Sequence, residues 1–165
     1  MVELKDMVLK AWSALKNRNA DQLREISGLC SDSAAVSQDE KILKLSLITY
    51  CFNKLLSKVH YRDKVEKLLD KSIERLNYGD FDGVLALIEE FDRKYSFFEG
   101  SLIEKARVKI ASRMYSSGLS MSQSADLLKI SVSNLLEYVG VTRVHNEMTT
   151  MGAMDRLKIA RTIFK

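Results

Sequence analysis

The sequence contains no proline among its 165 residues, and it has only seven glycines and two cysteines. Because proline and clustered glycines interrupt helices, their scarcity favours long helices and excludes a flexible linker rich in these residues. The longest apolar run, LSLITYCF, has eight residues, whereas a membrane-spanning helix needs roughly 18. The first residues include Glu3 and Asp6, which are not typical of a signal or transit peptide. We therefore expect a cytoplasmic protein without a membrane partner.

Groups that carry out catalysis are also scarce. Cys30 and Cys51 lack the CxxC spacing of a zinc or redox site, which favours buried or free thiols. His60 and His145 have no cysteine or second histidine at the short spacing of a zinc site. No cysteine has a histidine base near it in the sequence, and no glycine-rich phosphate loop occurs. We expect no catalytic residue, no metal site and no cofactor, and so no enzyme.

One segment, YGDFDG at 78–83, approaches the pattern of a calcium-binding loop. With Gly83 at the glycine position, Asp80, Asp82 and Glu89 fall at ligand positions. Tyr78 would then stand first, where the loop needs a carboxylate. A helix that begins here, with Asp80 or Asp82 as its N-cap, explains the same residues more simply.

Apolar residues recur at helical spacing through most of the chain, and no alternating strand pattern of convincing length occurs. The predicted helices lie at about 3–16, 19–30, 37–60, 64–79, 82–100 and 101–118. Asn19 is a candidate N-cap, and three capping boxes begin at Ser37, Ser101 and Ser120. We expect an all-α fold, built as a bundle of helical hairpins.

Two corners of this bundle are alike in sequence. Leu15–Ile26 and Leu76–Leu87 align with Asn19 over Asp80. The second corner, YGDFDGVLALIEEF, resembles the inter-helix corner of a tetratricopeptide repeat, over about half a repeat. The two corners are 61 residues apart, which does not fit a repeat of about 34 residues. We interpret them as similar hairpin corners and not as a repeat array.

Charge is distributed unevenly along the chain. Residues 1–100 hold 16 Lys and Arg against 17 Asp and Glu, whereas residues 101–165 hold 10 against five. A basic carboxy-terminal part suggests an anionic partner. We divide the chain at about residue 100, into a helical interaction or oligomerisation module (1–100) and a basic module (101–165).

The basic module contains the string YSSGLSMSQSADLLKISVSNLLEYVG at 115–140. The spacing of Ala125, Leu128, Ile130 and Leu135 resembles that of the helix-turn-helix DNA-binding family, in the compact form of prokaryotic regulators and antitoxins. The resemblance covers roughly 111–141 and implies a recognition helix at 132–138, with Gly140 as its stop signal. Lys129 stands at the joint, where many family members have glycine.

The resemblance also implies a set of DNA contacts. The outward residues of the recognition helix would read or touch DNA, and cations around that helix would grip the phosphates. This helix itself contains Glu137 and no Lys or Arg. The predicted nucleic-acid-binding residues are Arg107, Lys109, Arg113, Lys129, Ser131, Ser133, Asn134 and Arg143.

The residues after this string are basic and apolar. Met148, Met151, Met154, Leu157 and Phe164 form a possible apolar stripe, with Arg and Lys on the other side. This pattern is compatible with a last helix packed on the core, a homodimer contact or a tail that follows phosphates.

Two functions remain open from the sequence, and a third, less favoured one is an RNA-associated accessory protein, which the same basic residues would permit. The first is a non-enzymatic DNA-binding protein, with duplex DNA favoured over RNA, acting as a transcriptional regulator or chromosome-associated factor. The second is a helical adaptor that binds another protein, in which the helix-turn-helix only closes the core. An electrostatically positive face around 132–138 would favour DNA, and an apolar groove would favour a protein.

Overall fold

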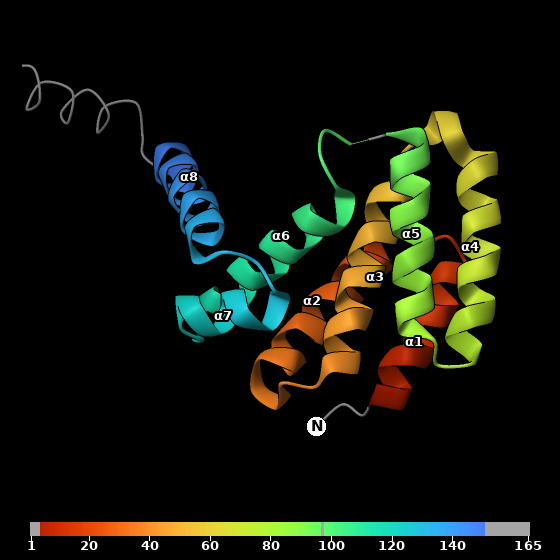
Figure 1. The fold of residues 1–165 in the computed structure, drawn as a ribbon, viewed down its shortest axis with the longest axis horizontal. Coiled ribbons are helices and arrows are strands. Elements are labelled where there is room, and N and C mark those ends of the chain that lie inside the picture. The colour runs from red at the N-terminus through yellow and green to blue at the C-terminus, as the bar shows by residue number, and fades with distance from the viewer. Residues whose placement is uncertain (1–3, 97, 151–165) are drawn as a thin grey trace, which may run out of the picture.

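The computed structural model describes residues 4–96 and 98–150, with the side chains of residues 59 and 142–150 excepted. Over these residues the chain forms helices and no strand, which confirms the all-α prediction (Figure 1). The helices are α1 (Leu4–Lys16), α2 (Ala20–Ser37), α3 (Glu40–Leu56), the short 3-10 helix η1 (Val59–Tyr61), α4 (Arg62–Asn77), α5 (Phe81–Tyr95), α6 (Leu102–Ser116), α7 (Met121–Leu128) and α8 (Val132–Thr150).

Helices α1 to α5 form a bundle, and α6 to α8 lie at one end of it (Figure 1). The most extensive contact joins α2 to α3, and α3 also contacts α1, α4, α5 and α6. Helix α6 packs on α2, α3 and α5 through one part of its surface and on α7 and α8 through another. One hydrophobic core therefore runs from Met7 in α1 to Leu135 in α8.

The central position of α3 follows from its sequence. Apolar residues occupy more than one face of this helix, so it is surrounded on several sides. Phe52, Leu45 and Ile48 are fully buried. The helix ends at Leu56, short of the predicted end near His60, because the backbone then turns into η1.

The two corners that are alike in sequence are alike in structure. Arg18 and Gly79 both adopt the left-handed conformation, with φ of 53° and 70°. In each corner the next residue donates its backbone N–H to a carbonyl five residues earlier, Asn19 to Ala14 and Asp80 to Arg75. This is the hydrogen bond of a Schellman helix ending, and it turns each pair of helices into a hairpin.

The predicted helix caps are mostly correct. The side chain of Asn19 accepts a hydrogen bond from the N–H of Gln22, and that of Asp80 accepts one from Gly83. At Ser101 only the hydroxyl half of the predicted box forms and caps α6, whereas Ser120 forms a complete capping box with Gln123.

The capping box predicted at Ser37 is wrong. Helix α2 continues to Ser37, and α3 begins after Asp39, whose carboxylate accepts from the N–H groups of Lys41 and Ile42 at 2.8 and 3.3 Å. A carboxylate is a stronger acceptor than a hydroxyl and suits the positive end of the helix dipole. The carboxylate of Asp39 therefore caps α3 in place of the Ser37 hydroxyl, two residues before it.

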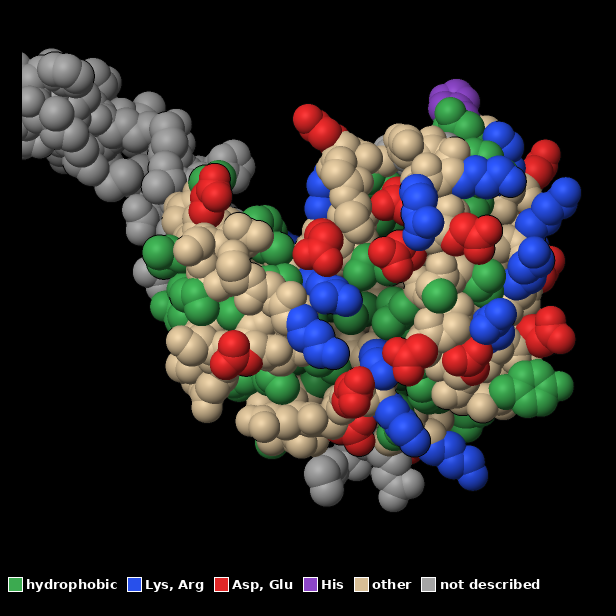
Figure 2. Space-filling model, viewed as in Figure 1, with side chains coloured by type: hydrophobic (Ala, Val, Ile, Leu, Met, Phe, Trp, Pro, Cys, Tyr) green, Lys and Arg blue, Asp and Glu red, His purple; other side chains and the backbone are tan. Residues whose placement is uncertain are grey.

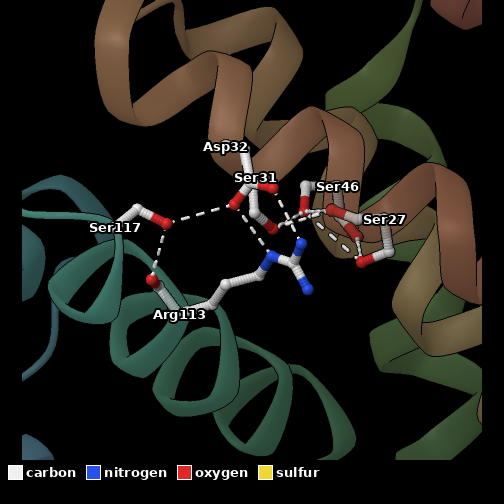
Figure 3. A network of polar contacts seen from close by, with 6 residues as sticks. All are labelled: Ser27, Ser31, Asp32, Ser46, Arg113 and Ser117. Carbon is white, nitrogen blue, oxygen red and sulfur yellow. Dashed lines mark hydrogen bonds and ion pairs between the residues drawn. The ribbon is translucent and has the colours of Figure 1, made fainter.

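The contact between α2 and α3 is polar at its centre (Figure 3). Ser27 and Ser46 exchange hydrogen bonds, each hydroxyl donating to the other's backbone carbonyl at 3.0 and 2.9 Å. The hydroxyl of Ser31 lies 2.7 Å from that of Ser46 and also donates to the carbonyl of Ser27. All three side chains are buried. Small hydroxyl side chains allow the two helices to approach closely while their polar atoms remain paired.

The size of Ser46 should matter more than its hydroxyl. In Ser46→Ala, Ser31 keeps its hydrogen bond to the Ser27 carbonyl, so we expect the free energy of unfolding to fall by about 0.5–1.5 kcal/mol. Ser46→Leu forces a large side chain between the helices, and we expect the free energy of unfolding to fall by about 1–3 kcal/mol or more. Urea denaturation followed by circular dichroism measures both. Equal stability of the two variants would contradict close packing at this position.

Candidate interaction site

Helix α6 is fixed at its amino end by two side chains. The buried carboxylate of Asp92, at the end of α5, accepts a hydrogen bond from the N–H of Leu102 at 2.7 Å. The hydroxyl of Ser101 accepts from the N–H of Glu104 at 3.4 Å. Acceptors at this end satisfy the free backbone N–H groups of a helix. They therefore set the direction in which α6 leaves the bundle.

The joint between α7 and α8 is tight and well capped. Lys129 ends α7 in the left-handed conformation with φ of 55°, and the N–H of Ile130 donates to the carbonyl of Ala125. The hydroxyl of Ser131 accepts from the N–H of Asn134 at 3.1 Å and so caps α8. The joint holds a lysine in a conformation that glycine adopts more easily.

The predicted stop at Gly140 is wrong. Helix α8 continues through Gly140 to Thr150, because glycine weakens a helix interior without preventing it. The resulting helix is much longer than the predicted 132–138.

The three predicted cations of α6 point to three different helices. A guanidinium nitrogen of Arg107 donates to the carbonyl of Leu128 at the end of α7 at 3.4 Å. The ammonium of Lys109 lies 5.7 Å from the ring centroid of Tyr138 in α8. Arg113 points to α2 (Figure 3). These side chains tie α6 to its neighbours and do not form one positive face.

Arg113 forms the best-defined ion pair of the three. Its guanidinium donates two hydrogen bonds to the carboxylate of Asp32, at 2.9 and 2.7 Å, and the hydroxyl of Ser117 donates a third at 3.2 Å (Figure 3). The guanidinium also lies over Gly28, where an added Cβ would stand 3.0 Å from it. Hydrogen bonding to Arg113 lowers the pKa of the Asp32 carboxyl, and the pKa of Arg113 is raised in return.

The other predicted contact residues lie on the surface. Lys129, Ser131, Ser133 and Asn134 are exposed, and they lie together at the joint and the first turn of α8. Arg143 belongs to the part of α8 whose side chains are not described, as does Met148, and the rest of the predicted apolar stripe lies after residue 150, outside the described residues.

The described part of α8 carries little charge. Val132, Leu136 and Val141 are 42%, 60% and 67% exposed, whereas Leu135 is fully buried. Glu137 is the one charged residue between 132 and 142. Figure 2 shows the same contrast on the visible face, with charged side chains dense over the bundle and sparse toward α7 and α8. Any phosphate contact from this part of α8 would come from hydroxyl or amide groups and not from a cation.

A shallow groove of about 650 Å³ lies between α6 and α8. Its lining is mostly apolar and includes Tyr50 from α3, Val108 from α6, and Tyr138 and Val141 from α8. Charged side chains of both signs also line it: Glu104, Lys105, Lys109 and Glu137. Lys109 and Asn134, two of the predicted binding residues, also line this groove. The sequence did not reveal the contribution of Tyr50, because Tyr50 is distant in the chain; an apolar residue at 141, after the predicted stop, was the available signal for α8.

Both thiols lie in the core. Cys30 and Cys51 are buried and unbridged. Burial raises the pKa of Cys30 to about 12 and that of Cys51 further. A thiol is a poor nucleophile when its pKa is far above neutral, which agrees with the interpretation of both as packing residues.

Within the described part of the chain, no group of three His, Cys, Asp or Glu side chains is arranged to hold a metal ion. None of the described helices is both long enough and apolar enough to cross a membrane.

No protein-family model, curated protein or solved structure matches this chain. The resemblance of 111–141 to the helix-turn-helix family therefore stays a prediction. What the fold defines is an all-α protein in which α6, α7 and α8 form a surface unit on a helical bundle.

The Asp32–Arg113 pair should make the free energy of unfolding depend on pH in the acidic range. The folded-state pKa of Asp32 is lowered, so the pair stabilises the fold above the unfolded pKa of about 3.9. That contribution is lost as pH falls through the lower folded-state pKa. Both side chains are about half exposed, so we expect Asp32→Asn to cost at most about 1 kcal/mol at pH 7. Urea denaturation at pH 7 and pH 2.5 should show the difference between wild type and variant shrinking at the lower pH. A constant difference would contradict this role.

Proposed function

We propose that this chain is a non-enzymatic helical adaptor that binds a segment of another protein in the groove between α6 and α8. The observation that carries the proposal is the lining of that groove. Apolar side chains from three helices meet there, including Tyr50, Val108 and Val141, and charges of both signs accompany them. Apolar grooves of this kind bind the apolar face of an amphipathic helix.

The chemistry of the groove suggests what the partner segment contains. Val141 is 67% exposed, so a partner side chain seated against it would remove apolar surface from water. Glu104, Glu137, Lys105 and Lys109 offer contacts to charges of either sign. A segment with an apolar stripe at helical spacing and flanking Lys and Glu would therefore fit better than a uniformly charged one.

Peptide selection tests this function directly. We expect purified protein to enrich phage-displayed 12-residue peptides with apolar residues at i, i+3, i+4 and i+7. Val141→Asp places a charge in the groove and should weaken binding of the enriched peptides at least 10-fold, as measured by fluorescence anisotropy.

Leu29→Asp is the matched control, because Leu29 is 56% exposed on α2, outside the residues that line the groove. This variant should bind like wild type. Enriched peptides that bind Val141→Asp as well as wild type, or a selection that enriches none, would contradict the proposal.

Duplex DNA is a second candidate partner, and one observation favours it. Lys129 is exposed and keeps a left-handed conformation at the joint, next to the exposed Ser133 and Asn134. Strained residues that persist in a fold are concentrated at functional sites. In this alternative the chain is a cytoplasmic transcriptional regulator or chromosome-associated factor of prokaryotic type, and Lys129 contacts phosphate.

DNA binding has its own salt and charge signature. If DNA binding occurs, affinity for a mixed-sequence 24-bp duplex should fall between 50 and 200 mM salt. A plot of log binding constant against log salt concentration should have a slope of about −0.9 per phosphate contact. Lys129→Glu should lower affinity and reduce that slope. Lys71→Glu, an equal charge change on the exposed surface of α4, should have a much smaller effect. Anisotropy that stays unchanged at 50 mM salt, or equal effects of the two variants, would exclude this candidate; a 24-bp RNA duplex distinguishes DNA from RNA.

A further inference from the structure

A small cavity of about 100 Å³ lies where three separate parts of the chain meet. These parts are the corner between α1 and α2, the end of α3 with the turn after it, and the first two turns of α4. Among the described residues that line the cavity, Arg18, Lys58 and Arg62 are cations and Glu66 is the one acid. None of these residues lines the groove between α6 and α8.

Two of the three cations have no acidic partner among the described residues. Glu66 pairs with Arg18, with 3.1 Å between Oε1 and Nε, whereas neither Lys58 nor Arg62 forms an ion pair there. The ammonium of Lys58 lies 4.9 Å from the ring centroid of Phe98, a contact that does not neutralise its charge. Residues 45–62 contain three Lys and Arg and no Asp or Glu. The lining of the cavity therefore has an excess of positive charge.

The position of Arg62 is unfavourable for the fold alone. Arg62 is the first residue of α4, and no side chain caps this helix start. Because the first turn of a helix has a partial positive charge, a cation there destabilises the helix. Asp63, the next residue, offsets part of this effect but does not line the cavity. An anion in the cavity would be attracted by Arg62 and would remove the repulsion.

The size and the lining of the cavity together indicate the class of ligand. The cavity is much smaller than the groove of about 650 Å³, so it suits one compact anionic group. Arginine and lysine are the side chains that bind phosphate most often. Arg18 uses Nε for Glu66, which leaves the N–H groups of its two terminal nitrogens as donors.

We propose that Arg18, Lys58 and Arg62 bind the phosphate group of a small ligand in this cavity. The ligand is either free phosphate or a phosphate monoester whose organic part lies outside the cavity. The three cations come from positions up to 44 residues apart in the sequence, and the fold brings them to one place.

An NMR titration of the ¹⁵N-labelled full chain with inorganic phosphate tests the site. Sodium chloride keeps the ionic strength constant, so that general salt effects cancel. We expect saturable shifts of the backbone amides of residues 18–20, 55–58 and 62–66, with a dissociation constant of about 1 mM or lower.

Charge removal tests the assignment of the residues. Lys58→Gln combined with Arg62→Gln should weaken phosphate binding at least 10-fold. Lys41→Gln combined with Lys71→Gln is the matched control, because both lysines are exposed and neither lines the cavity; it should bind like wild type. Circular dichroism verifies that each variant is folded. In phosphate-free buffer, Arg62→Gln alone should resist urea at least as well as wild type, because it removes a cation from a helix start.

Glycerol 3-phosphate distinguishes the two sources of the phosphate group. Binding at least 10-fold tighter than that of inorganic phosphate identifies a monoester as the ligand, and a smaller difference identifies free phosphate. Two results would overturn the proposal: neither compound causes saturable shifts, or the variant without Lys58 and Arg62 binds phosphate like wild type. The outcome is independent of the proposed adaptor function, because that variant should keep binding the selected peptides and Val141→Asp should keep binding phosphate.

Discussion

The position of α6 is the constraint on which the carboxy-terminal part of the structure depends. This helix buries side chains on two sides, and Ala106 and Ala111 are fully buried. Small residues allow neighbouring helices to approach it closely, so α2, α3 and α5 pack on it from the bundle and α7 and α8 pack on it from outside. Because Asp92 caps its first turn and Arg113 ties its last turn to α2, α6 has little freedom relative to the bundle. The surface that α6 forms with α8 is therefore also held in place on the bundle.

Sequence reasoning was reliable where the determining interactions are local. The helix caps at Asn19, Asp80 and Ser120 involve partners three residues away, and the similar corners depend on contacts within six residues. It failed at Gly140, because a glycine ends a helix only if the following backbone leaves the helical conformation. It also could not foresee that Arg113 pairs with Asp32, 81 residues away, or that Tyr50 lies beside α8 in the groove. Such contacts depend on the tertiary arrangement, which the spacing of residues does not encode.

The contacts of Arg107 and Arg113 change how the basic charge of the chain should be interpreted. Residues 101–141 contain five Lys and Arg against three Asp and Glu, whereas residues 142–165 contain five against two. Within the first set, Arg107 contacts the end of α7 and Arg113 is bound to Asp32. The ion pair with Asp32 therefore offsets the charge of Arg113, while Lys105, Lys109 and Lys129 remain exposed. Much of the excess positive charge belongs to residues after 141, whose side chains lie outside the described part of the structure.

The scarcity of charge on α8 has a physical explanation if each of its faces meets a different surface. Leu135 faces inward and closes the core, Tyr138 and Val141 face the groove, and Val132, Leu136 and Gly140 face outward. A helix that serves only to close a core needs one apolar face, and its other faces normally carry charged residues. Here the apolar residues extend around the helix, at a cost in exposed apolar surface that the isolated chain does not recover. A contact with a partner segment in the groove would remove part of that surface from water.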